Sequence, residues 1–316
     1  MSNSNIEWTE KTWNPLAGCT RASEGCDNCY AAGMALRLEA MALKDVAEGK
    51  DPGGKSKYVG IATRTAGGRA AFNGVINLDE DAITAPTTWY KPAVVFVNSM
   101  SDLFHKDVPD EFLDRIFLVM RGADWHTFQI LTKRPERMKE YINSRWVSLG
   151  LAQAKHIWLG TSVENQATAD VRLPALVNTR AHVRFVSAEP LLGAVDLSHW
   201  LQAIHWVIVG GESGSQARPM HINWARAVRD QCQAEGTKFF FKQWGEWVKV
   251  GERNMMPLNQ LGKLKFMRPD GSFLNKGDFL DASMIGVWRA GKKAAGRLLD
   301  GREWNEMPGK EGQWLS

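Results

Sequence analysis

Cysteine is scarce in this sequence, and long apolar runs are missing. Four cysteines in 316 residues are too few for the disulfide framework of a small secreted protein. The apolar runs are short, such as residues 94–97, and none approaches the roughly 20 residues of a membrane-spanning helix. No targeting segment is recognisable either. We therefore expect a cytoplasmic protein that has no membrane partner.

A strong net charge is also absent. The 39 basic residues nearly balance the 35 acidic ones, which leaves a formal charge of +4 and permits a polyanionic partner without requiring one. Fourteen tryptophans is a high count, and stacking on nucleic-acid bases uses such residues, as do large cores. A basic segment with Lys292, Lys293 and Arg297 is either a phosphate contact or a solvated surface. Composition alone does not decide between these alternatives.

Three of the four cysteines lie within eleven residues. Cys19, Cys26 and Cys29 form a C-x6-C-x2-C pattern in a loop whose glycines and small polar residues let the sulfurs converge. Three thiolates are one short of the four in a closed structural zinc site or an ordinary [4Fe–4S] site. A metal centre with an open position usually binds a further ligand, so this loop is our candidate active centre.

The cysteine pattern leaves three interpretations open. The first is an open iron–sulfur site, and the second is a zinc site completed by Cys232 or by a histidine. The third is a set of unrelated buried cysteines, although cysteines rarely cluster so tightly. Cys232 falls within a helix expected over residues 223–234, so we interpret it as a core thiol. Isolated histidines such as His105 and His126 are more typical of packed or solvated positions than of metal ligands.

From residue 94 onward, short apolar runs alternate with amphipathic stretches. The runs are rich in β-branched and aromatic residues, and they cover residues 94–97, 128–131, 156–159, 183–186, 206–209 and 238–241. The stretch over 109–120 opens with proline and acidic residues, as a helix N-terminus does. Continuously apolar strands that alternate with helices predict a parallel sheet covered on both faces. Together with a first strand before the cysteine loop, this repeat predicts an α/β fold with a full or partial parallel (β/α) barrel.

A polar cluster follows each of these runs. The clusters are residues 98–102, 132–134, 161–165, 187–190, 210–213 and 243–246. The carboxyl ends of barrel strands form one rim, where catalytic groups collect, so six successive clusters predict a shared polar cavity. Four charged residues either line the substrate side of this cavity or form salt bridges across its rim: Arg134, Glu164, Arg172 and Glu189.

Two segments depart from the barrel pattern. Residues 49–92 are rich in glycine, lysine and threonine and follow a first helix expected over 30–47, so we interpret them as an insertion or flap. The pattern stops again at residue 245. We therefore predict an α/β barrel over 1–244 and a small C-terminal cap, a hairpin plus a short helix, over 245–316.

These motifs resemble a phage- and prophage-associated family that is defined by a three-cysteine N-terminal motif. The resemblance covers nearly the whole chain and is carried by residues 13–15 with the cysteine loop, 96–105, 131–135, 210–213 and 300–304. At a greater distance, the strand-end pattern is similar to radical S-adenosylmethionine (SAM) enzymes, particularly the spore photoproduct lyase branch. The usual loop in those enzymes is C-x3-C-x2-C, three residues shorter than the loop in this chain.

The resemblance implies a pair of cofactors. Cys19, Cys26 and Cys29 would ligate three irons of a [4Fe–4S] cluster, and SAM would chelate the fourth iron. An external electron donor would reduce the cluster, which would then split SAM and release a radical that abstracts a hydrogen atom from substrate.

The resemblance also implies contacts to SAM. Lys133 and Ser162 would bind its carboxylate, and its amino group or ribose would be contacted by Asn98, Ser99 and Asp102. Glu212 follows two glycines that permit close backbone approach, and its carboxylate can accept hydrogen bonds from the same ligand. A tight turn with a solvated glutamate is the alternative for Glu212.

We therefore predict an iron–sulfur, SAM-dependent radical enzyme that modifies or repairs a nucleic-acid component. The nucleic-acid partner follows from the mildly basic balance, the many aromatic residues and the resemblance. The sequence identifies no catalytic residue beyond the cofactor ligands. One alternative is a zinc-dependent nucleic-acid-binding module without redox chemistry, and the other is a radical-SAM enzyme that acts on a peptide or a small metabolite.

Overall fold

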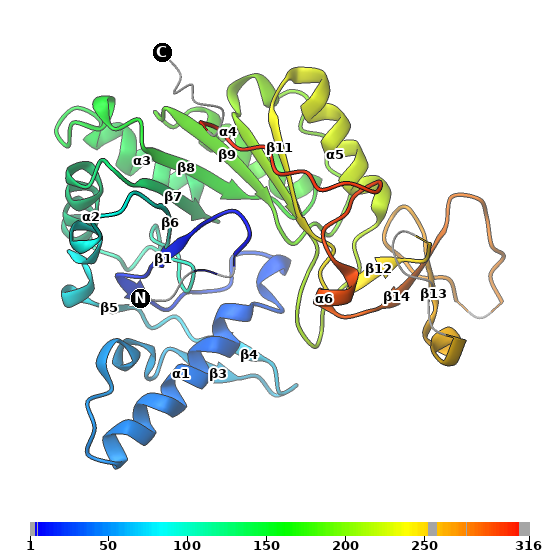
Figure 1. The fold of residues 1–316 in the computed structure, drawn as a ribbon, viewed down its shortest axis with the longest axis horizontal. Helices are drawn as coiled ribbons and strands as arrows, with labels where there is room; N and C mark the ends of the chain where they lie inside the picture. Colours follow the sequence, from blue (N-terminus) through cyan, green and yellow to red (C-terminus); the bar gives the residue numbers. More distant parts are fainter. Residues whose placement is uncertain (1–3, 5, 252–257, 276, 310–316) are drawn as a thin grey trace. The chain divides into compact units, whose positions relative to one another are not determined.

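The computed structural model describes residues 4, 6–251, 258–275 and 277–309. Seven strands form one sheet in the order β1-β6-β7-β8-β9-β10-β11 (Figure 1). They are β1 (Lys11–Trp13), β6 (Val94–Val97), β7 (Thr127–Thr132), β8 (Ile157–Ser162), β9 (Val183–Ala188), β10 (Trp206–Gly210) and β11 (Lys238–Gln243). The resolved strand registers in this sheet are parallel. The predicted α/β fold with a partial parallel barrel is confirmed, and each predicted run overlaps one strand.

Helices connect the strands of this sheet. They are α1 (Tyr30–Ala47), α2 (Asp110–Gly122), α3 (Pro135–Arg145), α4 (Gln166–Val177) and α5 (Ile222–Glu235). Asp110 and Glu111 lie in the first turn of α2, where carboxylates interact favourably with the helix dipole. Gly236 ends α5 in the left-handed conformation (φ 71°), which glycine adopts without strain. Among the described helices, none is long and apolar enough to cross a membrane.

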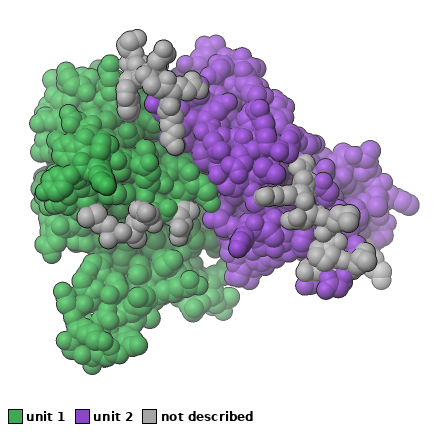
Figure 2. All heavy atoms as spheres, viewed as in Figure 1, with its two compact units in different colours: residues 1–161, 174–184 green, residues 162–173, 185–316 purple. Residues whose placement is uncertain are grey.

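The chain divides into two compact units, which are coloured separately in Figure 2. The first unit comprises residues 1–161 and 174–184, and the second comprises residues 162–173 and 185–316. In the first unit, an aromatic cluster joins α2 and α3. The rings of Phe104, Phe117 and Tyr141 lie with their centroids 5.4 to 6.4 Å apart. Cores of this kind fix the strands whose ends carry the polar clusters.

The segment that we interpreted as an insertion or flap packs on α1 within the first unit. It contains an antiparallel hairpin of β3 (Ala62–Arg64) and β4 (Ala70–Phe72), which lies beside α1 in Figure 1. Small side chains on α1, Ala31 and Ala35, permit close packing against Tyr58 and Ile61. The segment therefore shares a hydrophobic core with the helix that follows the cysteine loop.

The C-terminal part of the second unit contains a separate small sheet. Its order is β12-β14-β13, with β12 (Trp247–Lys249), β13 (Lys265–Met267) and β14 (Ile285–Arg289) antiparallel, and it is followed by the short helix α6 (Lys292–Ala295). The chain then returns to β11, where Phe240 forms an antiparallel bridge with Asn305. Asp300 accepts hydrogen bonds from Arg226 and Arg229 of α5. The motif at residues 300–304 thus covers an edge strand, which would otherwise offer unpaired backbone groups.

Candidate metal centre

Strand β1 leads into the cysteine loop, and the turn after β6 holds the entrance of that loop in place. The side-chain oxygen of Asn14 accepts hydrogen bonds from the Ser99 hydroxyl (3.2 Å) and the Met100 N–H (3.1 Å). The Ser101 hydroxyl donates to the Leu16 carbonyl (3.1 Å). Ser99, which the resemblance placed near SAM, therefore donates to Asn14 and helps to join two segments that lie far apart in the sequence.

Gly18 stands directly before the first cysteine, in a conformation that only glycine adopts readily. Its φ is +100°, and a Cβ at this position would lie 2.0 Å from the carbonyl oxygen of Val75. Both the backbone angle and the available space exclude a larger residue. The close approach of two backbone segments thus sets the path of the chain into Cys19.

Each of the three cysteines of the loop occupies a different backbone environment. Cys26 ends a short 3-10 helix, and its sulfur accepts a hydrogen bond from the Ala22 N–H (3.5 Å). Cys29 is the N-cap residue of α1. Burial raises the pKa of Cys29, and the backbone N–H groups of Ala32 and Ala31 at the start of the helix partly offset this rise. The helix therefore offers its N-terminal donors to a thiolate at Cys29.

Cys19 is half-buried, and its thiol lies near both a carboxylate and a guanidinium. Burial, with a smaller effect of the nearby Asp102 carboxylate, raises the pKa of the Cys19 thiol to about 12, while Arg134 acts in the opposite direction. The thiol of the metal-free chain is thus protonated at neutral pH. A thiophilic metal that binds here must displace this proton, which couples metal binding to proton release.

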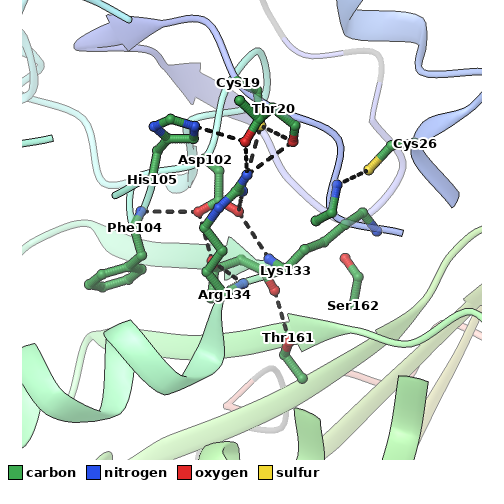
Figure 3. Close-up of polar contacts among 12 residues, drawn as sticks. Cys19, Thr20, Cys26, Asp102, Phe104, His105, Lys133, Arg134, Thr161 and Ser162 are labelled. Carbon is green, nitrogen blue, oxygen red and sulfur yellow. Dashed lines mark hydrogen bonds and ion pairs between the residues drawn. The ribbon is translucent and has the colours of Figure 1, made fainter. Parts of the chain in front are cut away.

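Arg134 joins the turn after β7 to the cysteine loop, as Figure 3 shows. Its Nη1 donates to Asp102 Oδ2 (2.8 Å) and lies 3.6 Å from Cys19 Sγ. Its Nη2 donates to the carbonyl oxygen (3.0 Å) and the hydroxyl (2.7 Å) of Thr20. Of the two alternatives for Arg134, the salt bridge is therefore confirmed, and its guanidinium faces the cysteine loop.

Asp102 is buried, and both of its carboxylate oxygens are bonded within the protein. Oδ1 accepts from the Phe104 N–H (3.0 Å) and the Thr132 hydroxyl (2.7 Å), and Oδ2 accepts from the Lys133 N–H (3.1 Å) and Arg134 (2.8 Å). These four donors fill the acceptor capacity of a carboxylate. Asp102 thus positions Arg134 and the turn after β7.

His105 lies beside the loop and is bonded through both ring nitrogens. Its Nδ1 accepts the backbone N–H of Asp107 (3.3 Å), so its Nε2 carries the proton that is donated to the Thr20 hydroxyl (2.9 Å). Burial, and to a lesser degree Arg134, lowers the pKa of His105 and keeps it neutral. His105 is therefore a packed residue, as the sequence indicated, and neither nitrogen is available to a metal.

Asn98 directly follows β6, and its side-chain amide is buried. It is only 2% exposed, its φ is +61°, and both its amide nitrogen and its amide oxygen are buried without a hydrogen bond. A buried polar group without a partner costs about 1–3 kcal/mol. A ligand with a donor and an acceptor would remove that cost.

Lys133 lies in the first unit and Ser162 in the second. Burial raises the pKa of the Cys29 thiol, and the Lys133 ammonium has a minor effect that opposes this rise. Ser162 is the last residue of β8 and is buried, and its carbonyl accepts from Arg172 Nη1 (2.8 Å). The SAM contacts expected of Lys133 and Ser162 stay predictions.

The donor set of this loop fits an iron–sulfur cluster. Arg134, the Ala22 N–H and the start of α1 place positive or N–H groups at Cys19, Cys26 and Cys29, and such groups stabilise thiolate-ligated clusters. Within the described ranges, no three Cys, His, Asp or Glu side chains converge to hold one metal ion. The three cysteines with a donor group at each match the three-thiolate ligation of an iron–sulfur cluster with one open iron. The choice between such a cluster and zinc stays a prediction.

Comparison with known proteins places the chain in a family. Residues 3–308 match the family described as "Protein of unknown function (DUF5131)". The chain belongs to this family. The phage association that the motifs imply stays a prediction, and no curated protein sequence matches the chain at a significant level.

The chain is also similar to solved structures of spore photoproduct lyase. One is a double mutant with bound AdoMet and dinucleoside spore photoproduct, with 12% identity, coverage of 91% of this chain and 71% of that chain, and a TM-score of 0.41. Another is the enzyme complexed with dinucleoside spore photoproduct, with 12% identity, coverage of 91% and 70%, and a TM-score of 0.38.

In the second unit of this DUF5131 member, Glu212 is bonded within the protein. Its carboxylate accepts from the backbone N–H (2.7 Å), Nε (3.0 Å) and Nη2 (2.7 Å) of Arg218. A Cβ at Gly211 would lie 2.0 Å from the Trp244 carbonyl oxygen, and one at Gly210 would lie 2.5 Å from the Glu189 carboxylate. These glycines permit close packing between neighbouring segments of the chain. Glu212 is only 6% exposed, so it is not the solvated glutamate of the tight-turn alternative, and its contact with SAM stays a prediction.

The other charged residues at the strand ends also form ion pairs. Glu164 and Arg172 are buried and bond at 2.9 Å, and Glu189 pairs with Lys242 at 2.9 Å. Of the two alternatives for these residues, the structure shows the salt bridges. Cys232 is fully buried in α5, so the prediction of a core thiol is confirmed.

Sequence reasoning missed several residues that build the site. Asn14 is part of the Trp13-Asn14-Pro15 motif, which could have drawn attention to its side chain. Thr20 and Gly18 lie beside Cys19, and nothing local distinguishes them from ordinary loop residues. Their roles depend on contacts with Arg134 and Val75, which are remote in the sequence.

Proposed function

We propose that this protein is an iron–sulfur, SAM-dependent radical enzyme that modifies or repairs a nucleic-acid component. The observation that carries the proposal is the donor group at each of the three cysteines of the loop. The unpaired amide of Asn98 after β6 also supports it. Cys19, Cys26 and Cys29 would hold the cluster. When bound, the cluster and SAM would supply one-electron radical chemistry, which amino-acid side chains do not provide.

The remaining residues would bind and orient the cofactors. The Lys133 ammonium would pair with the SAM carboxylate. The Asn98 amide, which has no hydrogen-bond partner within the protein, would form hydrogen bonds to SAM. Asp102 would act indirectly. Its four hydrogen bonds within the protein fix the turn that carries Lys133 and Arg134.

Reconstitution with iron and sulfide under anaerobic conditions tests this function. We expect about four irons per chain and release of 5′-deoxyadenosine after SAM and dithionite are added. Cys26→Ala should abolish the release, because it removes one cluster ligand. Cys232→Ala is the matched control, since it removes a buried thiol outside the loop and should retain both cluster and release. Tightly bound zinc, or a cluster that never cleaves SAM, would contradict the proposal.

A second arm of this experiment measures SAM affinity. Asn98→Gly removes the amide but tolerates the positive φ, so we expect the cluster to form and SAM to bind about tenfold more weakly in equilibrium dialysis. Asn143→Ala changes an exposed amide on α3 that bonds to the Asn178 carbonyl, and it should leave the affinity unchanged. Equal SAM binding by Asn98→Gly and the native chain would remove Asn98 from the SAM site.

The substrate class rests on the mild positive charge, the tryptophan content and the motif resemblance. A radical enzyme that acts on a peptide or a small metabolite would show SAM cleavage without affinity for nucleic acid. Salt-dependent binding of oligonucleotides therefore separates the two substrate classes.

A further inference from the structure

Arg134 is tied at one end to Asp102 and at the other to the cysteine loop (Figure 3). Its side chain is only 18% exposed, and its four bonding partners are Asp102 Oδ2, the two oxygens of Thr20 and Cys19 Sγ. The guanidinium therefore cannot turn away from Cys19 without breaking several charge-assisted hydrogen bonds.

We infer that Arg134 is a positioning residue that sets the reduction potential of the cluster through its contact with Cys19 Sγ. The inference rests on the proposed function, since it requires a cluster on the three cysteines. Hydrogen bonds to the ligating sulfurs and the net charge nearby are among the factors that set cluster potentials. A reduced cluster carries one more negative charge, so a fixed cation at a ligating sulfur stabilises the reduced form and raises the potential.

The surroundings strengthen this effect. Cys19 is half-buried, and a charge–charge interaction in a poorly hydrated site is stronger than in water. Asp102 carries the opposite charge, but its oxygens also accept hydrogen bonds from Phe104, Thr132 and Lys133, which disperse its charge away from the sulfur. Arg134 acts on the sulfur in two ways, through its charge and through the N–H that it presents to Cys19 directly.

Arg134 also anchors the cysteine loop through its hydrogen bonds to Thr20. Different variants can separate this structural role from an effect on the reduction potential. Arg134→Gln removes both the charge and the sulfur contact, whereas Arg134→Lys retains the charge without the planar fork. Thr20→Val removes a hydroxyl that accepts from Arg134 and leaves the contact between Arg134 and Cys19. Arg134→Gln therefore tests the reduction potential, whereas Thr20→Val tests the anchoring of the loop.

The experiment is anaerobic redox potentiometry of the reconstituted full chain, with the reduced cluster followed by electron paramagnetic resonance. We expect Arg134→Gln to disfavour reduction at least tenfold, which is about 59 mV to lower potential for a one-electron couple. Arg134→Lys should shift the potential in the same direction but less, and Thr20→Val should shift it least. Asp102→Asn, which removes a negative charge, should shift the potential upward.

The outcomes separate this inference from the proposed function. A native cluster that cleaves SAM, together with an unchanged potential in Arg134→Gln, would overturn the role of Arg134 and leave the function intact. A native chain that binds no cluster would overturn the proposed function itself. If Arg134→Gln fails to hold a cluster, Arg134→Lys decides: a lowered potential supports the inference, and a native potential overturns it.

Discussion

At the scale of single residues, three buried histidines share one arrangement. The Nδ1 atoms of His105, His126 and His221 each accept a backbone N–H, from Asp107, Ala93 and Asn223 respectively. An acceptor nitrogen carries no proton, so all three rings are neutral. Burial is the main cause that lowers the pKa of each ring. These histidines therefore favour folding only while they stay uncharged.

This arrangement predicts a loss of stability in mild acid. Free histidine has a pKa near 6.5, so between that value and the lower pKa of the folded state the unfolded chain binds more protons. Stability therefore rises with pH in this window and falls as the pH drops below about 6.5. We expect urea unfolding to give a smaller free energy at pH 5.5 than at pH 7.5. His126→Gln should show a smaller difference between the two pH values, whereas the exposed control His199→Gln should not.

Carboxylates do not account for a loss in this window. Asp300 and Asp45 also have lowered pKa values, chiefly through hydrogen bonds from Arg226 and Lys55. A carboxylate whose pKa is lowered in the folded state stabilises the fold above its unfolded pKa of about 4. This stabilisation is lost only as the pH falls below that value. An unchanged pH dependence in His126→Gln would therefore assign the loss to other groups and contradict the prediction.

At the scale of secondary-structure elements, the sequence predicted the strands and the main helices well. Runs such as residues 94–97 and 206–209 are apolar throughout because both faces of their strands are buried, and such a pattern is local. The partners of a side chain that follows a strand are not a local property. Arg134 faces Cys19 because Asp102, 32 residues earlier, accepts its Nη1–H. Sequence patterns thus selected the cysteine loop as the candidate site and could not pair its residues.

The C-terminal tail is a second element whose role only the structure reveals. Asp300 joins the tail to α5 through Arg226 and Arg229, and the following residues cover β11. We expect Asp300→Asn to lower the unfolding free energy by roughly 1 kcal/mol, a value reduced by partial solvent exposure, and to increase aggregation on mild heating. Urea unfolding and light scattering measure the two effects.

The neighbouring Asp230 provides the matched control for this prediction. It pairs with Arg229 on the same helix, and its side chain is 61% exposed. Asp230→Asn should therefore change neither stability nor aggregation by a measurable amount. Equal behaviour of the two variants would show that Asp300 does not hold the tail on β11.

At the scale of the whole molecule, the charge of +4 gives a weak overall attraction for polyanions, so nucleic-acid affinity must come from local groups. Lys292 and Lys293 of α6 are the residues to test. Arg297 is unsuitable, because its Nε donates to the Lys242 carbonyl (3.0 Å) and its guanidinium lies over Phe240 (5.2 Å). Reversing the charge of Arg297 would disturb packing as well as binding.

We expect the chain to bind oligonucleotides with an affinity that falls as salt rises. Charge reversal at both Lys292 and Lys293 should weaken binding and reduce the slope of log affinity against log salt by about 1 to 2, because each phosphate contact contributes roughly 0.7–0.9 to that slope. Reversal of Lys44 and Lys50, which pair with Glu48 at the end of α1, is the matched control and should change the slope little. Fluorescence anisotropy over a salt series measures both. If SAM is cleaved but the chain shows no salt-dependent affinity for oligonucleotides, the radical chemistry acts on a peptide or a small metabolite.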